Sequence, residues 1–130
     1  MRYLSLALGT AIVAVWSCSD PQGVNCPSVE RAALRLVLED SVTGVRFPFE
    51  DVVASARDGG FEDNASVASI DGSATSPTAL PLAFGRAGTY EVDVTAQGYD
   101  AWSVDGISVS GDQCHLPATR TLIVRLQPTG

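Results

Sequence analysis

The clearest pattern in this sequence is a strict alternation of apolar and polar residues between Gly88 and Gly98. Its apolar members are Tyr90, Val92, Val94 and Ala96. A period of two with one apolar face is typical of a half-buried β-strand. We expect this strand to lie at the centre of the fold and Gly98 to reverse the chain with a positive φ.

Six further segments have the composition or alternation of strands, and turn residues separate them. They are residues 33–40, 51–57, 66–70, 79–84, 102–109 and 119–127. Pro48 predicts an irregular or edge segment before the second of these strands, and Gly106 predicts a β-bulge inside the sixth. A helix beginning at Ser28 is the alternative for the first segment, but its alternating leucines favour a strand. Seven short strands predict an all-β fold, a β-sandwich.

The N-terminal segment has the features of an export signal. It has one early arginine and then an apolar run of roughly a dozen residues, which is too short to predict a transmembrane helix. The run ends at Cys18 in a pattern that resembles the lipobox of bacterial lipoproteins, whose cysteine carries acyl chains such as palmitate. The resemblance implies a lipoprotein signal peptide over 1–17, lipidation of Cys18 and a lipidated tether over 18–31. Simple secretion is the alternative.

The chain has three cysteines, an odd number. If Cys18 is consumed by lipid, Cys26 and Cys114 remain as a pair in an oxidising compartment, where we expect a disulfide bond. If the signal is cut elsewhere and Cys18 survives as a thiol, one cysteine is left over.

The charge balance excludes one large class of partners. The chain contains eight arginines, no lysine and fifteen acidic residues, for a net charge of −7. Nucleic-acid binding depends on clusters of basic residues that neutralise phosphates. We therefore expect no nucleic-acid partner and a solvated acidic surface.

Several segments together resemble the carboxypeptidase regulatory-like domain. They are Asp-Ser-Val-Thr-Gly at 40–44, Gly-Thr-Tyr-Glu-Val-Asp-Val-Thr-Ala-Gln-Gly-Tyr at 88–99, Val-Asp-Gly-Ile-Ser-Val at 104–109 and Val-Arg-Leu-Gln-Pro at 124–128. The resemblance implies that residues 32–128 form a seven-stranded Greek-key sandwich like that of transthyretin (prealbumin). In the family this domain is usually non-catalytic and attached to peptidases, receptors or surface proteins.

Candidate chemistry is sparse. His115 is the single histidine, no cysteine pair has zinc spacing, and no nucleophile-elbow motif occurs, so we expect neither an enzyme nor a resident cofactor. Oxygen ligands that could be considered for calcium are Asp58, Glu62, Asp63, Asn64 and Asp71, but their spacing matches no EF-hand loop. We therefore expect no metal.

These observations favour a lipid-anchored protein of the bacterial cell envelope with one non-catalytic β-sandwich. Its role would be structural or protein-binding, with the membrane as one partner through the lipid and an envelope protein or polysaccharide as another. The alternative is a secreted or surface module that binds carbohydrate or another ligand through Tyr99 and Trp102, if these rings are exposed.

Overall fold

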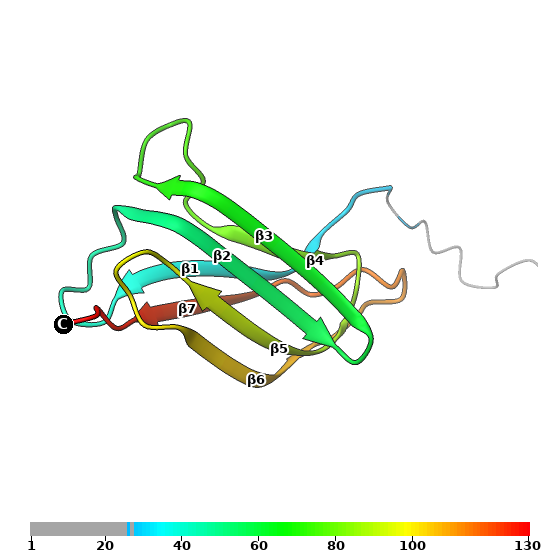
Figure 1. Cartoon of the computed structure of the whole chain (residues 1–130). Coiled ribbons are helices and arrows are strands. Elements are labelled where there is room, and N and C mark those ends of the chain that lie inside the picture. The colour runs from blue at the N-terminus through cyan, green and yellow to red at the C-terminus, as the bar shows by residue number, and fades with distance from the viewer. Residues whose placement is uncertain (1–25, 27) are drawn as a thin grey trace, which may run out of the picture.

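Seven β-strands in two sheets make up the computed structural model, which describes residue 26 and residues 28–130 (Figure 1). The strands are β1 (Ala32–Asp40), β2 (Phe49–Asp58), β3 (Phe61–Ile70), β4 (Leu80–Phe84), β5 (Gly88–Thr95), β6 (Trp102–Val109) and β7 (Arg120–Leu126). The predicted all-β fold with seven strands in a sandwich is thereby confirmed.

One sheet has three strands in the order β4-β1-β7, and the other has four in the order β3-β2-β5-β6. β1 and β7 run parallel, and every other pair of neighbouring strands is antiparallel. The segment that precedes β1 and the β6–β7 loop lie at one end of the sandwich, and the C-terminus lies at the other (Figure 1). The two ends therefore present different loops.

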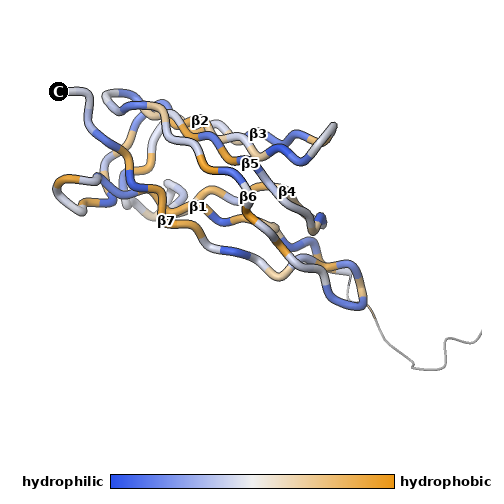
Figure 2. Tube along the Cα trace, turned by 90° about the horizontal axis from the view of Figure 1, so that it is seen from below, coloured by the Kyte–Doolittle hydropathy of each residue, from blue (hydrophilic) through white to orange (hydrophobic). Residues whose placement is uncertain are grey.

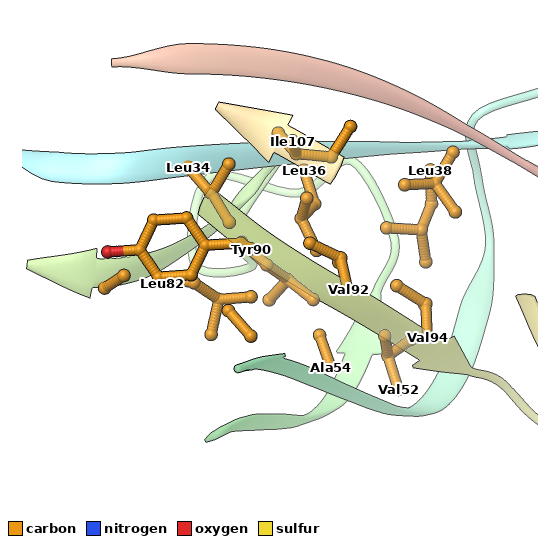
Figure 3. Close-up of a cluster of buried hydrophobic side chains, with 14 of the residues drawn as sticks. Leu34, Leu36, Leu38, Val52, Ala54, Leu82, Tyr90, Val92, Val94 and Ile107 are labelled. Carbon is orange, nitrogen blue, oxygen red and sulfur yellow. The ribbon is translucent and has the colours of Figure 1, made fainter. Parts of the chain in front are cut away.

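The core lies between the sheets, and β5 supplies its centre, as the alternation predicts. Tyr90, Val92 and Val94 are fully buried and face the leucines of β1 across the interior (Figure 3). Those leucines are Leu34, Leu36 and Leu38. Burial of each such side chain stabilises the fold by about 1.5–3 kcal/mol. The apolar and polar positions alternate along the strands of both sheets (Figure 2).

The bulge predicted at Gly106 is confirmed. The pairing of β5 with β6 shifts register between Tyr90, opposite Ile107, and Val92, opposite Val104. Asp105 and Gly106 therefore oppose one residue of β5, and Gly106 takes the left-handed φ of 68°. Glycine adopts this conformation without steric cost.

The predicted strand 66–70 is too short. β3 begins at Phe61 and pairs with β2 from Asp58 onward. Sequence pattern did not show the first half because, apart from Phe61, its residues are polar or small. β3 is an edge strand, and its inward residues are only half-buried. Pairing with β2 extends the strand through this part, where only Phe61 and Ala65 add apolar contacts with the core.

Candidate functional site

A disulfide closes the end of the sandwich from which the N-terminal segment leaves. Cys26 and Cys114 are joined at an S–S distance of 2.03 Å, across 88 positions of sequence. The loop that holds Cys114 is shaped by Asp112, whose Oδ1 accepts the backbone N–H groups of Cys114 at 2.8 Å and Leu116 at 2.9 Å. The predicted pairing of Cys26 with Cys114 is present. The lipidation site Cys18, the signal peptide and most of the tether lie outside the described residues.

Tyr99 packs over the core at the opposite end. The preceding Gly98 has φ 80°, as predicted, and the ring centroid of Tyr99 lies 5.1 Å from that of Phe49. The Tyr99 hydroxyl donates to Asp40 Oδ2 at 3.0 Å. Desolvation, and after it the hydrogen bond to this carboxylate, raise the pKa of Tyr99. These contacts give the ring a structural role.

Asp40 completes that arrangement. Its Oδ1 accepts the backbone N–H groups of Val42 at 2.8 Å and Thr43 at 3.0 Å, which fixes the turn after β1. The N–H groups of Thr43 and Val42 lower the pKa of Asp40 below its ordinary value. One carboxylate thus joins the β1 turn to the Tyr99 loop.

Trp102 does not form an exposed platform with Tyr99. It is paired with Val94 across β5 and β6, and directly paired residues share a face of the sheet. Val94 is buried in the core, so Trp102 points to the same side, and both aromatic rings are half-buried against the core cluster. A ligand-binding role for the two rings stays a prediction that this placement does not favour.

The outward face of the four-stranded sheet carries a polar network centred on Arg57. Its guanidinium donates to Glu91 Oε1 at 2.9 Å and to Asp93 Oδ2, and Ser103 donates to the other oxygen of Asp93. Glu62 lies opposite Arg57 on β3. With Asp105 of β6, this set forms what we call the acidic face: Glu62, Glu91, Asp93 and Asp105 around Arg57.

An open hollow lies on the acidic face beside the bulge of β6. It measures about 250 Å³ and is lined by Glu91, Ser103, Val104 and Asp105. Glu91 and Asp105 therefore border the same space, and Glu91 is about half exposed. Two carboxylates and a hydroxyl in an open hollow are suited to a cationic group such as a guanidinium.

The outward face of the three-stranded sheet has the opposite charge. Arg35, Val37 and Glu39 of β1 lie opposite Thr121, Ile123 and Arg125 of β7. Glu39 Oε1 is 3.5 Å from Arg125, and its other oxygen is 3.8 Å from Arg46 of the β1–β2 loop. We call this set the basic face: Arg35, Arg46 and Arg125 around Glu39, with Val37 and Ile123 between the charges. Ile123 is 45% exposed.

A third polar cluster lies at the disulfide end and is structural. The Tyr90 hydroxyl donates to the backbone oxygen of Arg86, and the Arg86 guanidinium lies 4.2 Å from the Phe61 ring centroid and 3.3 Å from Asp58 Oδ2. Burial raises the pKa of Tyr90. Gly88 permits this packing, because a Cβ there would collide with the Asp58 carboxylate.

Three of the four acidic residues considered for calcium have other partners. Asp58 pairs with Arg86, Asp63 accepts the backbone N–H of Ala83 at 2.7 Å, and Asp71 accepts that of Ser73 at 2.8 Å. The described residues contain no group of three or more histidine, cysteine, aspartate or glutamate side chains positioned to hold a metal ion. His115 lies in the Cys114 loop with φ 61°.

Comparison with known proteins identifies no family. No protein-family model matches the chain, and a search of curated proteins found no match. Within residue 26 and residues 28–130, no helix is long and apolar enough to cross a membrane. An all-β, two-sheet architecture does not by itself indicate a function, so the function is argued from the residues of this chain.

Sequence pattern alone did not identify the two charged faces. Arg57, Glu91 and Asp93 occupy outward positions of their strands, and that alternation was the available signal. Alternation does not specify the register between strands. The register brings Arg57 opposite Glu91 and places Asp93 opposite Ser103. The order of strands within each sheet then collects carboxylates on one side and guanidinium groups on the other.

Proposed function

We propose that this protein is a lipoprotein of the bacterial cell envelope whose single, non-catalytic β-sandwich has a structural or protein-binding role. The observation that carries the proposal is the use of the cysteines. Cys26 and Cys114 form the disulfide, so Cys18 is the one cysteine outside that pair, and it directly follows the apolar N-terminal run. A disulfide is favoured in an exported, oxidising compartment, which agrees with such a signal.

The fold supports the finer assignment to the carboxypeptidase regulatory-like domain. That resemblance implies a sandwich of seven strands, and seven strands are present in two sheets. The hallmark segment, residues 88–99, supplies the central strand, the Gly98 turn and the Tyr99 ring that covers the core. These residues pack in or against the core, which agrees with a non-catalytic domain of this kind.

The first experiment determines the mature N-terminus of the protein purified from detergent-solubilised envelope of its host. We expect mass spectrometry to find Cys18 as the first residue, with acyl chains attached. Cys18→Ser should remove the acyl mass and move the protein out of the membrane fraction. An unacylated mature N-terminus would reject the anchor.

A matched control separates the anchor from folding. The double substitution Cys26→Ser with Cys114→Ser leaves Cys18 in place, so acylation should persist although the disulfide is lost. In Cys18→Ser the Cys26–Cys114 bond should form as in the native chain, since the two features are 8 or more residues apart in sequence. Loss of acylation in the double variant would mean that lipid attachment depends on the folded domain.

A further inference from the structure

The charges of this acidic protein are divided between opposite sides of the sandwich. The acidic face has four carboxylates and one guanidinium, whereas the basic face has three guanidinium groups and one carboxylate. The two sheets form separate layers (Figure 2). Each face is built on outward residues of its own sheet, so the two faces point away from each other. The chain has a net charge of −7, yet it concentrates positive charge on one sheet. A uniformly acidic surface would have no such positive patch.

Each face also keeps charges without an internal partner. Arg35 is exposed and forms no ion pair with a described residue, and Arg46 and Arg125 share the single carboxylate of Glu39. Glu62 and Asp105 likewise form no ion pair within the described chain, while Arg57 is occupied by Glu91 and Asp93. Both faces can thus form further ion pairs with an oppositely charged surface.

We propose that the basic face of one copy of this chain docks on the acidic face of a second copy, in a head-to-tail contact. An arginine of the basic face enters the hollow lined by Glu91, Ser103 and Asp105, where its guanidinium meets two carboxylates. Ile123 and Val37 supply the apolar part of the contact on the basic face. On the four-stranded sheet of the other copy, a second hollow of roughly 240 Å³ around Val53 and Ala68 offers apolar surface.

The contact is heterologous, because a different surface of each copy is used, so each dimer leaves one basic and one acidic face free for further copies. A three-stranded sheet face is small, which places the contact in the weak class that buries less than about 1,200 Å² in total. The association does not depend on the proposed lipid anchor. Confinement to a membrane would raise the effective concentration and strengthen it.

The test uses the full chain in a non-ionic detergent and two charge-reversal variants. Arg35→Glu with Arg125→Glu reverses the basic face, and Glu62→Arg with Asp105→Arg reverses the acidic face. Sedimentation velocity should show concentration-dependent association of the native chain. Its dissociation constant should rise by about tenfold or more when ionic strength increases from about 0.02 M to about 0.5 M, because screening weakens exposed charge pairs.

Each reversal variant alone should sediment as a monomer, and an equimolar mixture of the two should associate, since the mixture restores one native pair of faces. The control Glu30→Arg with Asp100→Arg changes net charge as the acidic-face variant does, on exposed residues outside both faces, and should associate like the native chain. Circular dichroism confirms that each variant is folded.

Three outcomes would overturn the proposal. They are a native chain that stays monomeric at every concentration tested, association that neither salt nor reversal changes, and variants that fail to associate when mixed. A native chain that remains monomeric but binds vesicles rich in phosphatidylglycerol, and loses that binding in Arg35→Glu with Arg125→Glu, would assign the basic face to an anionic lipid surface instead.

Discussion

Asp40 and its partners show what a single side chain decides in this protein. Its carboxylate is buried at the end of β1, yet every contact it makes is a hydrogen bond that favours the charged form: two from the β1–β2 turn and one from Tyr99. Such a carboxylate links local turn geometry to a residue 59 positions away. A buried charge is tolerated only where its lone pairs are satisfied in this way.

The lowered pKa of Asp40 makes part of the stability dependent on acid. Below its ordinary value of 3.8 the unfolded chain binds a proton at this residue before the folded chain does, so the free energy of unfolding decreases as pH falls. The stabilisation is complete above that value and is lost as pH falls through the lower pKa of the folded state. Asp40→Asn should therefore lower the free energy of unfolding at neutral pH. In this variant, the free energy of unfolding should also decrease less steeply as pH falls.

Urea denaturation at a series of pH values from neutral to about pH 2 measures how the free energy of unfolding depends on pH in the native chain and in Asp40→Asn. Asp100→Asn is the control, because Asp100 is exposed and its side chain forms no hydrogen bond with a described residue. Acid profiles that coincide for the two variants would contradict the role assigned to Asp40. Asp71, whose pKa is lowered by hydrogen bonds to Ser73, should leave some acid dependence in both.

At the scale of elements, the β-bulge of β6 shapes the surface of the four-stranded sheet. It is an edge strand of the four-stranded sheet, and its bulge at Asp105 and Gly106 interrupts regular pairing with β5. Bulges of this kind protect an edge from pairing with another strand. The same bulge brings Asp105 beside Glu91 and so shapes the hollow on the acidic face.

Gly106 is the residue on which the bulge depends. Its φ is 68°. Apart from its two chain neighbours, no described residue has an atom within 4 Å of the position that an alanine Cβ would occupy, so Gly106→Ala should meet backbone strain without a steric clash. We expect the free energy of unfolding to fall by about 1–2 kcal/mol, and by less for Gly106→Asn, since asparagine tolerates this conformation better.

Gly60→Ala is the matched control for this substitution. Gly60 also has open space around it, but its φ does not lie in the left-handed region, so alanine should cost little there. Urea denaturation of the three variants gives the comparison. Equal stabilities for Gly106→Ala and Gly60→Ala would show that the bulge relaxes without penalty.

At the scale of the whole molecule, one core holds the two sheets together, and a disulfide fastens the segments that lead into β1 and β7. The strands that begin and end the domain, β1 and β7, are parallel neighbours, so the chain closes on itself in the three-stranded sheet. The Cys26–Cys114 bond ties the segment before β1 to the loop before β7. A domain of this size buries a real core but gains from such a link.

Removal of the disulfide should be the most costly of the changes considered. A closed loop of 88 positions restricts the unfolded chain by about 4–5 kcal/mol in the entropic model, which is an upper value for what the bond contributes. Cys26→Ser with Cys114→Ser should lower the free energy of unfolding by several kcal/mol, to be measured by urea denaturation. The native chain should lose the same amount on reduction, and no loss in either case would contradict a stabilising role.

Local pattern determined most of the architecture. Alternation in residues 88–97 and in the leucines of β1 identified the inward faces, and glycines at 98 and 106 identified the turn and the bulge. The count of three cysteines, with Cys18 assigned to lipid, predicted the pair Cys26 and Cys114. Each of these signals acts within a few residues or follows from a simple count. The first half of β3 lacked a clear signal, because Phe61 is its one large apolar residue and its place depends mainly on pairing with β2.

The sequence by itself therefore determined that this chain forms a seven-stranded sandwich with a disulfide, since burial of apolar faces and turn chemistry are written in short stretches. Only the tertiary structure decided how the outward residues are grouped. Register and strand order bring Arg57 together with Glu91 and Asp93 on one sheet and Arg35 together with Arg125 on the other. The sequence pattern of charged residues does not specify which of them become neighbours on the surface. Their grouping is therefore set by the register and order of the strands.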